Sequence, residues 1–226
     1  CRTDSTERNS GEKACWNLEG LSKTGKDKKP DTKTNSVMKQ GAEAQVTIKE
    51  QQVVKKRAPK NYRNNSIDER IRKERTEQEL KNIQRARKYN VNVPETEKKS
   101  EYTLTQKRID GDILKDIINS KPEILGKVGS NVARLHSADI VHGDLTTSNL
   151  IQADKVYLID FGLSYISERT EDKSMDIHLL KKTLQTSHPS ISERAWNSFI
   201  KQYREYDDSE KVMERLEEVD SSGRYK

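Results

Sequence analysis

The sequence of 226 residues predicts an α+β fold of two lobes, in which a small strand-rich lobe precedes a helical lobe. Three observations predict this arrangement. First, short apolar stretches typical of strands follow a polar segment at the start of the chain. Second, one long segment with helical spacing of its apolar residues lies between these stretches. Third, the second half of the chain has apolar residues mainly at helical spacing. Because only 31% of the residues are hydrophobic and 35% are charged, we expect a core that is small for the length.

The first lobe is expected to begin after a polar segment. Residues 1–36 lack apolar periodicity, so we expect them to form a disordered tail or a linker between domains. Between Val46 and Val54, short apolar stretches predict twisted antiparallel strands. A helix with Ser66 as its N-cap should follow, and then a further strand around Leu104.

The second lobe is expected after the turn-forming Asp110-Gly111 pair. We therefore assign residues 37–109 to the first lobe and residues 110–226 to the second. The expected elements of the second lobe are a helix opened by Pro122, strands at Leu150–Ile151 and Val156–Ile159, and helices at Asp172–Leu184, Ile191–Tyr203 and Ser209–Val219.

Composition narrows the class of protein and its compartment. No apolar run is long enough to span a membrane, so no membrane association is expected. Cys1 and Cys15 both lie in the polar segment, where they cannot cross-link a core, and we expect a reducing, cytoplasmic compartment. The net charge of +6 has its basic excess in the first hundred residues. That excess would suit a nucleotide or RNA, although charge alone favours a solvated basic surface.

The most specific motif runs from His142 to Asn149 (HGDLTTSN) and is followed, after an apolar strand, by Asp160-Phe161-Gly162. An Asp, an Asn five residues later and an Asp-Phe-Gly after a strand are typical of phosphotransferases. Asp144 would accept a proton from the attacking hydroxyl or water, or orient it. Asn149 and Asp160 supply the hard oxygen ligands that Mg²⁺ prefers when it bridges nucleotide phosphates.

An upstream lysine and glutamate complete the candidate set. Lys55 ends a predicted strand and could reach the α- and β-phosphates of ATP, while Glu79 in the following helix could pair with it. Lys56 competes for the role of Lys55, because the pleat of the strand decides which side chain points inward. Lys and Glu are abundant here, so without the downstream motif the pair alone would favour a solvated lysine and a surface glutamate.

Two further segments bear on phosphate binding and on substrate choice. The loop Gly41, Ala42, Glu43 and Ala44 contains one glycine, and its backbone N–H groups could contact phosphate. After Gly162 the sequence has no Ala-Pro-Glu and no long activation segment. Since that segment normally builds the platform for a peptide substrate, its loss argues against a broad signalling kinase.

The motif and its surroundings resemble a known family, the small atypical Ser/Thr kinase and ATPase subunit of the KEOPS complex (PRPK-like). The resemblance covers about residues 37–226. It rests on the segments already described and on Lys39–Ala44, Val54–Arg57, Pro59–Arg63, Arg75–Glu79, Glu171–Lys173 and Gly223–Lys226.

The resemblance implies a minimal two-lobed, protein-kinase-like fold that lacks a long activation segment. It implies an ATP- and Mg²⁺-dependent enzyme that phosphorylates Ser or Thr and acts as an ATPase in support of threonylcarbamoyl-adenosine modification of tRNA. The implied partners are the tRNA-modifying threonylcarbamoyltransferase subunit and other KEOPS subunits, with tRNA contacted indirectly or through basic regions.

The implied roles fall on the residues identified above. Asp144, Lys55 and Glu79 would be catalytic, and Asn149 and Asp160 would bind Mg²⁺. The loop Gly41 to Ala44 would cover the phosphates of ATP, and backbone groups at Lys107 and Arg108 would hold the adenine.

Some positions depart from the family pattern. Asp220-Ser221-Ser222 stand where family tails often carry arginines, which puts tRNA binding by the tail in doubt. The first residue is Cys, and Arg2-Thr3-Asp4 resembles the end of the tRNA-modifying subunit. Because many archaea fuse the two subunits, we hypothesise that the chain is the C-terminal part of such a fusion.

Two other functions remain open at this point. One is a free-standing kinase for Ser/Thr or for a small molecule, in which Asp144 activates a substrate hydroxyl. The other is a catalytically idle scaffold that only binds partners. The complete Lys–Glu–Asp–Asn–Asp set disfavours the scaffold, and the short segment after Asp160 disfavours peptide substrates.

Overall fold

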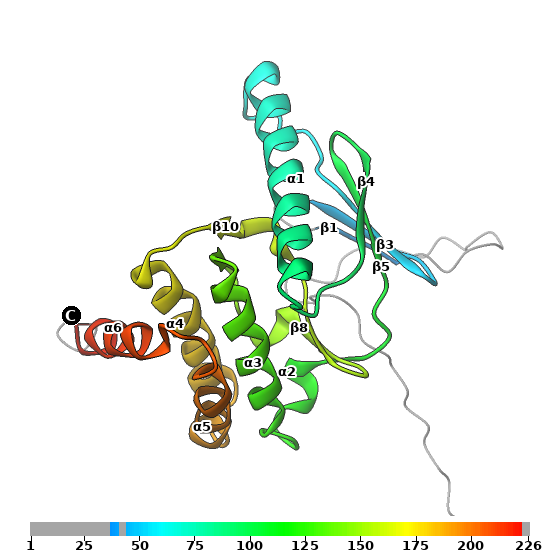
Figure 1. The fold of residues 1–226 in the computed structure, drawn as a ribbon. Coiled ribbons are helices and arrows are strands. Elements are labelled where there is room, and N and C mark those ends of the chain that lie inside the picture. Colours follow the sequence, from blue (N-terminus) through cyan, green and yellow to red (C-terminus); the bar gives the residue numbers. More distant parts are fainter. Residues whose placement is uncertain (1–36, 41–43, 223–226) are drawn as a thin grey trace, which may run out of the picture.

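The computed structural model describes residues 37–40 and 44–222. The expected tail or linker at residues 1–36 and the phosphate-loop residues Gly41, Ala42 and Glu43 lie outside the described residues. The first lobe is built on one antiparallel sheet with the strand order β1-β2-β3-β5-β4 (Figure 1). Its strands are β1 (Val37–Gln40), β2 (Gln45–Ile48), β3 (Gln52–Lys56), β4 (Thr96–Ser100) and β5 (Thr103–Lys107).

A single long helix, α1 (Asn65–Lys88), lies beside this sheet (Figure 1). The prediction that Ser66 is its N-cap was wrong by two residues. Asn64 takes that place, because its Oδ1 accepts hydrogen bonds from Ser66 N at 3.1 Å and from Ser66 Oγ at 2.8 Å. Asn and Ser are similarly good caps, and only the backbone geometry decides between two close neighbours.

Strand β4 was not predicted from the sequence. Its residues, Thr-Glu-Lys-Lys-Ser, are polar, and only the first of them is buried. The β4–β5 hairpin is nevertheless tied to α1 by ion pairs of Lys98 Nζ with Glu77 at 3.0 Å and of Lys73 Nζ with Glu101 at 2.5 Å. These exposed pairs link the hairpin to the helix that carries Glu79.

The second lobe packs helices against two small sheets (Figure 1). Helices α3 and α5 approach closely at Gly129, where a Cβ atom would lie only 2.3 Å from the carbonyl oxygen of Phe199. The elements are β6 (Asp112–Ile113), α2 (Leu114–Ile117), α3 (Ile124–Ser137), β7 (Ile140–Val141), η1 (Thr147–Asn149), β8 (Leu150–Gln152), β9 (Val156–Leu158), η2 (Phe161–Leu163), β10 (Tyr165–Ile166), α4 (Thr170–Ser187), α5 (Ser192–Tyr203) and α6 (Ser209–Ser222).

The buried apolar side chains form two clusters. The larger one fills the helical lobe and includes the inward faces of α3, α4, α5 and α6. The smaller one joins the lobes, since it combines Ile48 and Val53 of the sheet with Ile151 and Ile159 of the second lobe. The predicted fold class is thereby confirmed, while the boundary between residues 37–109 and 110–226 stays a prediction.

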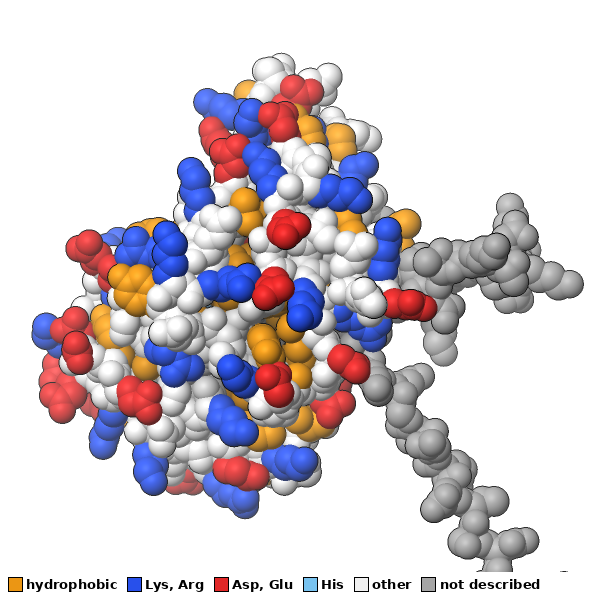
Figure 2. Space-filling view, turned by 45° about the vertical axis from the view of Figure 1, so that its right-hand side comes forward, with side chains coloured by type: hydrophobic (Ala, Val, Ile, Leu, Met, Phe, Trp, Pro, Cys, Tyr) orange, Lys and Arg blue, Asp and Glu red, His pale blue; other side chains and the backbone are white. Residues whose placement is uncertain are grey.

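The surface mixes charges of both signs. On the face shown in Figure 2, basic and acidic side chains are interspersed over both lobes and do not gather into one basic patch. Within residues 37–40 and 44–222, no helix combines the length and the apolar character needed to cross a membrane.

Candidate active site

Three of the predicted side chains meet where the sheet faces α1 and the end of β9. Lys55 Nζ donates to Glu79 Oε1 at 2.7 Å and to Asp160 Oδ1 at 2.6 Å. The pleat of β3 decides between the two candidate lysines, because Lys55 is buried and Lys56 is exposed. The structure thus places Lys55, Glu79 and Asp160 in one ion-paired group.

The electrostatics of this group follow from its contacts. Burial opposes the charged form of Lys55, but the carboxylates of Glu79 and Asp160 outweigh that cost and raise the pKa of Lys55. In turn, the charge of Lys55 lowers the pKa of Asp160 to about 2, against the opposing effect of burial. The Asp160 side chain is still 43% exposed, so a metal ion that binds the phosphates of a nucleotide can reach it.

The loop from His142 to Asn149, called the catalytic loop below, supplies two more of the predicted residues. Asn149 Nδ2 donates to the carboxylate Oδ2 of Asp144 at 2.8 Å and to its backbone oxygen at 2.9 Å. Strands β8 and β9 pair antiparallel immediately after Asn149 and before Asp160, and Ile159 N donates to Asn149 O at 3.0 Å. The paired strands therefore bring Asn149 and Asp160 to the same end of the β8–β9 pair.

The arrangement at this end of the β8–β9 pair fits a magnesium ion that also binds phosphate. Asn149 Oδ1 is buried and has no hydrogen-bond partner within the described ranges, whereas Nδ2 of the same amide donates to Asp144. A buried oxygen without a partner carries a desolvation cost that a cation would remove. Together with the ionised carboxylate of Asp160, it offers two hard oxygen ligands, the small number that a phosphate-bridging Mg²⁺ takes from a protein.

The backbone of the catalytic loop is held by a residue of α4 that was not predicted from the sequence. Asp176, on α4, accepts hydrogen bonds from His142 N at 2.7 Å through Oδ2 and from Gly143 N at 3.0 Å through Oδ1. Gly143 has a φ of +78°, and a Cβ atom there would lie 2.5 Å from the Leu163 carbonyl oxygen. A glycine is therefore required at the turn that delivers Asp144 to the site.

His142 supports the loop through its ring. Its Nε2 lies 3.0 Å from Ile159 O, and its ring packs against that of Phe161 with centroids 4.9 Å apart. Asp160 itself has a left-handed backbone, with a φ of 61°, and Gly162 N donates to its Oδ1 at 3.3 Å. Through these contacts the His142 side chain supports the loop that carries Asp144.

Helix α1 is also joined to the segment after Asp160. Asn82 Nδ2 donates to Ser164 Oγ at 2.8 Å, and Ser164 Oγ donates to Phe161 O at 2.7 Å. Both side chains are buried. No sequence signal pointed to Asn82, because a single Asn on a helix has many structural uses.

The remaining predicted residues are those assigned to the phosphates and the adenine of ATP. Ala44 is buried and directly precedes β2. Lys107 N donates to Glu95 O at 2.8 Å and Arg108 N donates to Gln51 O at 3.0 Å. Because both N–H groups are already engaged, an adenine held by Lys107 and Arg108 would have to use their carbonyl oxygens.

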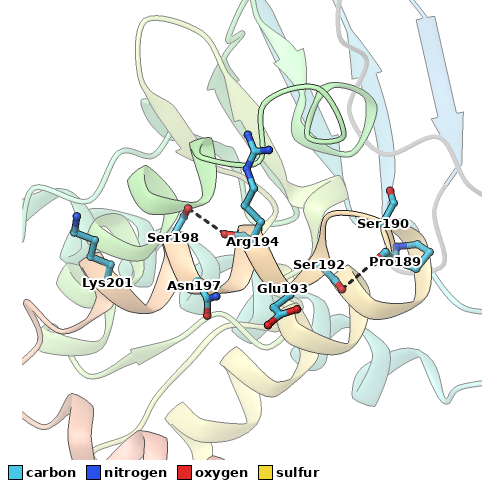
Figure 3. A pocket seen from close by; sticks show the side chains of 8 residues that line it. All are labelled: Pro189, Ser190, Ser192, Glu193, Arg194, Asn197, Ser198 and Lys201. Atoms are coloured by element: carbon cyan, nitrogen blue, oxygen red, sulfur yellow. Dashed lines mark hydrogen bonds between the residues drawn. The ribbon is translucent and has the colours of Figure 1, made fainter.

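A hollow elsewhere on the second lobe is unrelated to these residues. It has a volume of about 630 Å³ and lies over the start and one face of α5 (Figure 3). Its lining residues other than Pro189 have polar or charged side chains, and none of the predicted site residues contributes to it. The lining residues are Pro189, Ser190, Ser192, Glu193, Arg194, Asn197, Ser198 and Lys201.

Comparison with known proteins identifies the family. Residues 26–193 match the RIO domain family. The chain is 36% identical to the "KEOPS complex subunit Bud32" of Pyrococcus abyssi, over 84% of this chain and 96% of that protein. The chain belongs to the Bud32 branch of the RIO-domain family. It is likewise 38% identical to a "Probable serine/threonine-protein kinase BUD32 homolog" of Archaeoglobus fulgidus, over 82% of this chain and 94% of the relative.

Other relatives of this Bud32-family chain are longer proteins. A "Probable bifunctional tRNA threonylcarbamoyladenosine biosynthesis protein" of Methanosarcina barkeri is 37% identical over 99% of the chain. The chain spans 42% of that protein's length, and 35% of the length of the similarly named protein of Methanosarcina mazei.

Solved structures share the fold at low sequence identity. The Rio2 kinase of Chaetomium thermophilum, in a complex described as ADP/Mg²⁺-phosphoaspartate, superimposes with a TM-score of 0.56 at 13% identity, covering 84% of this chain and 71% of that one. WaaP, in complex with acyl carrier protein, gives the same TM-score and identity, with coverage of 85% and 90%. These likenesses confirm the kinase-like fold of the Bud32-family chain.

Proposed function

We propose that this chain is an ATP- and Mg²⁺-dependent atypical Ser/Thr kinase and ATPase that supports threonylcarbamoyl-adenosine modification of tRNA within a KEOPS-type complex. The observation that carries the proposal is the joint placement of Lys55, Glu79 and Asp160 beside an Asn149 whose Oδ1 is buried without a partner. Phosphoryl transfer depends on positioned charge of this kind. The printed names of the Pyrococcus and Methanosarcina relatives support the KEOPS and tRNA part of the proposal.

Each side chain of the site would have a separate role in phosphoryl transfer. A bound Mg²⁺ neutralises phosphate charge, and Asn149 Oδ1 with the Asp160 carboxylate would hold it. Lys55 would donate to the α- and β-phosphates while Glu79 keeps its ammonium in place. Asp144, oriented by Asn149, would align the attacking hydroxyl or water and accept its proton.

The adenine would lie against the small apolar cluster between the lobes. Ile48 and Val53 of the sheet and Ile151 and Ile159 of the second lobe already pack together there. Apolar walls with a few backbone acceptors are the usual surroundings of a nucleotide base. The carbonyl oxygens of Lys107 and Arg108 supply acceptors for the exocyclic amine.

The experiment is ATP turnover by the full chain at several Mg²⁺ concentrations. Asp160→Asn should lower turnover by at least about a hundredfold, because the substitution removes the charge that Lys55 and Mg²⁺ both need. Asp207→Asn is the matched control, since Asp207 is exposed and distant in sequence from the site. Each assay is run alone and then with tRNA and the tRNA-modifying threonylcarbamoyltransferase subunit.

The outcomes separate the three functions. Turnover that rises with tRNA and the partner, and is lost in Asp160→Asn, supports the proposal. Turnover that ignores both additions while label appears on an acceptor protein would favour a free-standing kinase. If the wild-type chain neither binds nor turns over ATP with the partner present, the chain is a scaffold.

A further inference from the structure

Arg57 lies two residues after Lys55 on the same side of the chain and shares its carboxylate. Its Nη2 donates to Glu79 Oε2 at 2.6 Å, while Lys55 Nζ takes the other oxygen, Oε1, at 2.7 Å. Glu79 is 1% exposed and Arg57 is 3% exposed. Each oxygen of a buried carboxylate thus has its own cation.

The side-chain hydrogen bonding of Arg57 within the described residues is directed at Glu79. Its Nη2 donates to Glu79, while its buried Nη1 has no hydrogen-bond partner within residues 37–40 and 44–222. The position that a Cβ atom of Gly162 would occupy lies 3.0 Å from Lys55 Nζ, 3.1 Å from Asp160 Oδ1 and 3.7 Å from Arg57 Nη2, so Arg57 lies close to the Lys55–Asp160 pair. Because its described side-chain hydrogen bond is to Glu79, an effect of Arg57 on the site would pass through that carboxylate.

The charges around Glu79 form a balanced row of four. Arg57 and Lys55 are cations, and Glu79 and Asp160 are anions, joined in the order Arg57–Glu79–Lys55–Asp160 by contacts of 2.6 to 2.7 Å. With Mg-ATP bound, Lys55 would share its hydrogen bonds with phosphate, and Asp160 would hold the metal. Without a second cation, Glu79 would compete for Lys55, because a buried carboxylate with one weakened partner is costly.

We propose that Arg57 is a positioning residue that satisfies the second oxygen of Glu79, so that Lys55 can be shared with the phosphates of the nucleotide. The inference rests on the proposed function and adds to it a residue outside the Lys–Glu–Asp–Asn–Asp set. In the absence of Arg57, both oxygens of Glu79 would turn to the Lys55 ammonium and draw it away from Asp160 and the phosphates.

The test measures nucleotide affinity by calorimetry with Mg-ATP, and KM and kcat by turnover, on the full chain. Arg57→Met should weaken binding and raise KM by about tenfold, the size expected for one hydrogen bond to a charged group. Arg57→Lys keeps a cation next to Glu79 and should restore affinity to within about threefold of wild type. If Arg57→Met does not fold, Arg57→Gln, which is neutral but can still donate, takes its place in the comparison.

Arg72→Met is the matched control. Arg72 is also buried and lies on α1, as Glu79 does. It forms an ion pair of 2.7 Å with Asp68, which is about three helical turns before Glu79. Its Nη1 also donates to the backbone oxygen of Arg57 at 3.4 Å. A general loss of stability should affect both arginine variants alike in thermal unfolding, whereas nucleotide affinity should fall only in Arg57→Met.

A double-mutant cycle with Glu79→Gln decides whether Arg57 acts through Glu79. The effect of Arg57→Met on affinity should largely vanish in the Glu79→Gln background, because the neutral amide no longer competes for Lys55. Additive losses, or equal affinities of Arg57→Met and Arg72→Met, would overturn the inference while leaving the proposed function intact. A wild-type chain that binds no Mg-ATP would overturn the proposed function and this inference together.

Discussion

Asp176 provides the most direct test of how the catalytic loop is held. Its two carboxylate oxygens accept hydrogen bonds from the backbone N–H groups of His142 and Gly143 at 2.7 and 3.0 Å, and the residue is only 3% exposed. Asp176→Asn keeps the shape of the side chain but turns one oxygen into an NH₂ donor. One of the two N–H groups then faces another donor and loses its acceptor.

The cost follows from the kind of bond that is lost. A hydrogen bond to a charged acceptor contributes about 1.5–3 kcal/mol, and the remaining bond weakens because its acceptor becomes neutral. We therefore expect a loss of about 3 kcal/mol in the free energy of unfolding. For a folded unit of this size, that corresponds to roughly 6–12 °C in Tm. Turnover should fall by about 10- to 100-fold, since small displacements of catalytic groups have effects of this order.

The assay combines thermal unfolding with ATP turnover of the folded variant. Asp207→Asn, an exposed substitution of the same chemistry, should leave both values unchanged. If Asp176→Asn unfolds within about 2 °C of the wild type and turns over ATP at its rate, the carboxylate does not hold the loop and the reasoning fails.

Three further predictions concern the metal site, the packing and the pH dependence. Asn149→Leu should raise the Mg²⁺ concentration for half-maximal ATP binding at least about tenfold, and an unchanged titration would exclude Asn149 as a ligand. Gly129→Val should lower the free energy of unfolding in urea by about 2 kcal/mol, since its side chain would collide with Phe199 O; equal stability would refute the close packing. Burial lowers the pKa of His136, so the unfolded chain binds more protons below about pH 6.5. Stability should therefore fall from pH 7 to pH 5 by at most about 1.4 kcal/mol per unit from this group, and His136→Gln should flatten that slope.

Much of the site was predictable because its residues lie in short, ordered stretches of sequence. The spacing of Asp144, Asn149 and Asp160 reflects a loop followed by two paired strands, and the antiparallel pairing of β8 with β9 brings the ends of that stretch together. The choice between Lys55 and Lys56 required only the pleat of β3. Local geometry was sufficient at these positions.

Residues that act through tertiary contacts were not predictable in this way. Asp176 lies 34 residues after His142 and 33 after Gly143, and nothing in the pattern of α4 distinguishes it from the other acidic residues of that helix. Arg57 ends the segment Val54–Arg57, which contributed to the family resemblance. Its proposed role depends on its hydrogen bond to the second oxygen of Glu79, and that contact is visible only in the folded structure. Strand β4 was missed because its pairing with β5, rather than an apolar pattern, makes it a strand.

The network around α1 explains how a short segment after Asp160 can suffice. In a kinase with a long activation segment, that segment orders the helix that carries the glutamate. Here the helix is held by contacts at several points: Asn82 with Ser164 near the site, Arg57 with Glu79 in the interior, and the ion pairs to the β4–β5 hairpin outside. Since these contacts already bring Glu79 to within 2.7 Å of Lys55, the Lys–Glu pair needs no ordering by a longer segment. Control of activity in this architecture would therefore act on access to the site or on the catalytic loop, and not on the position of α1.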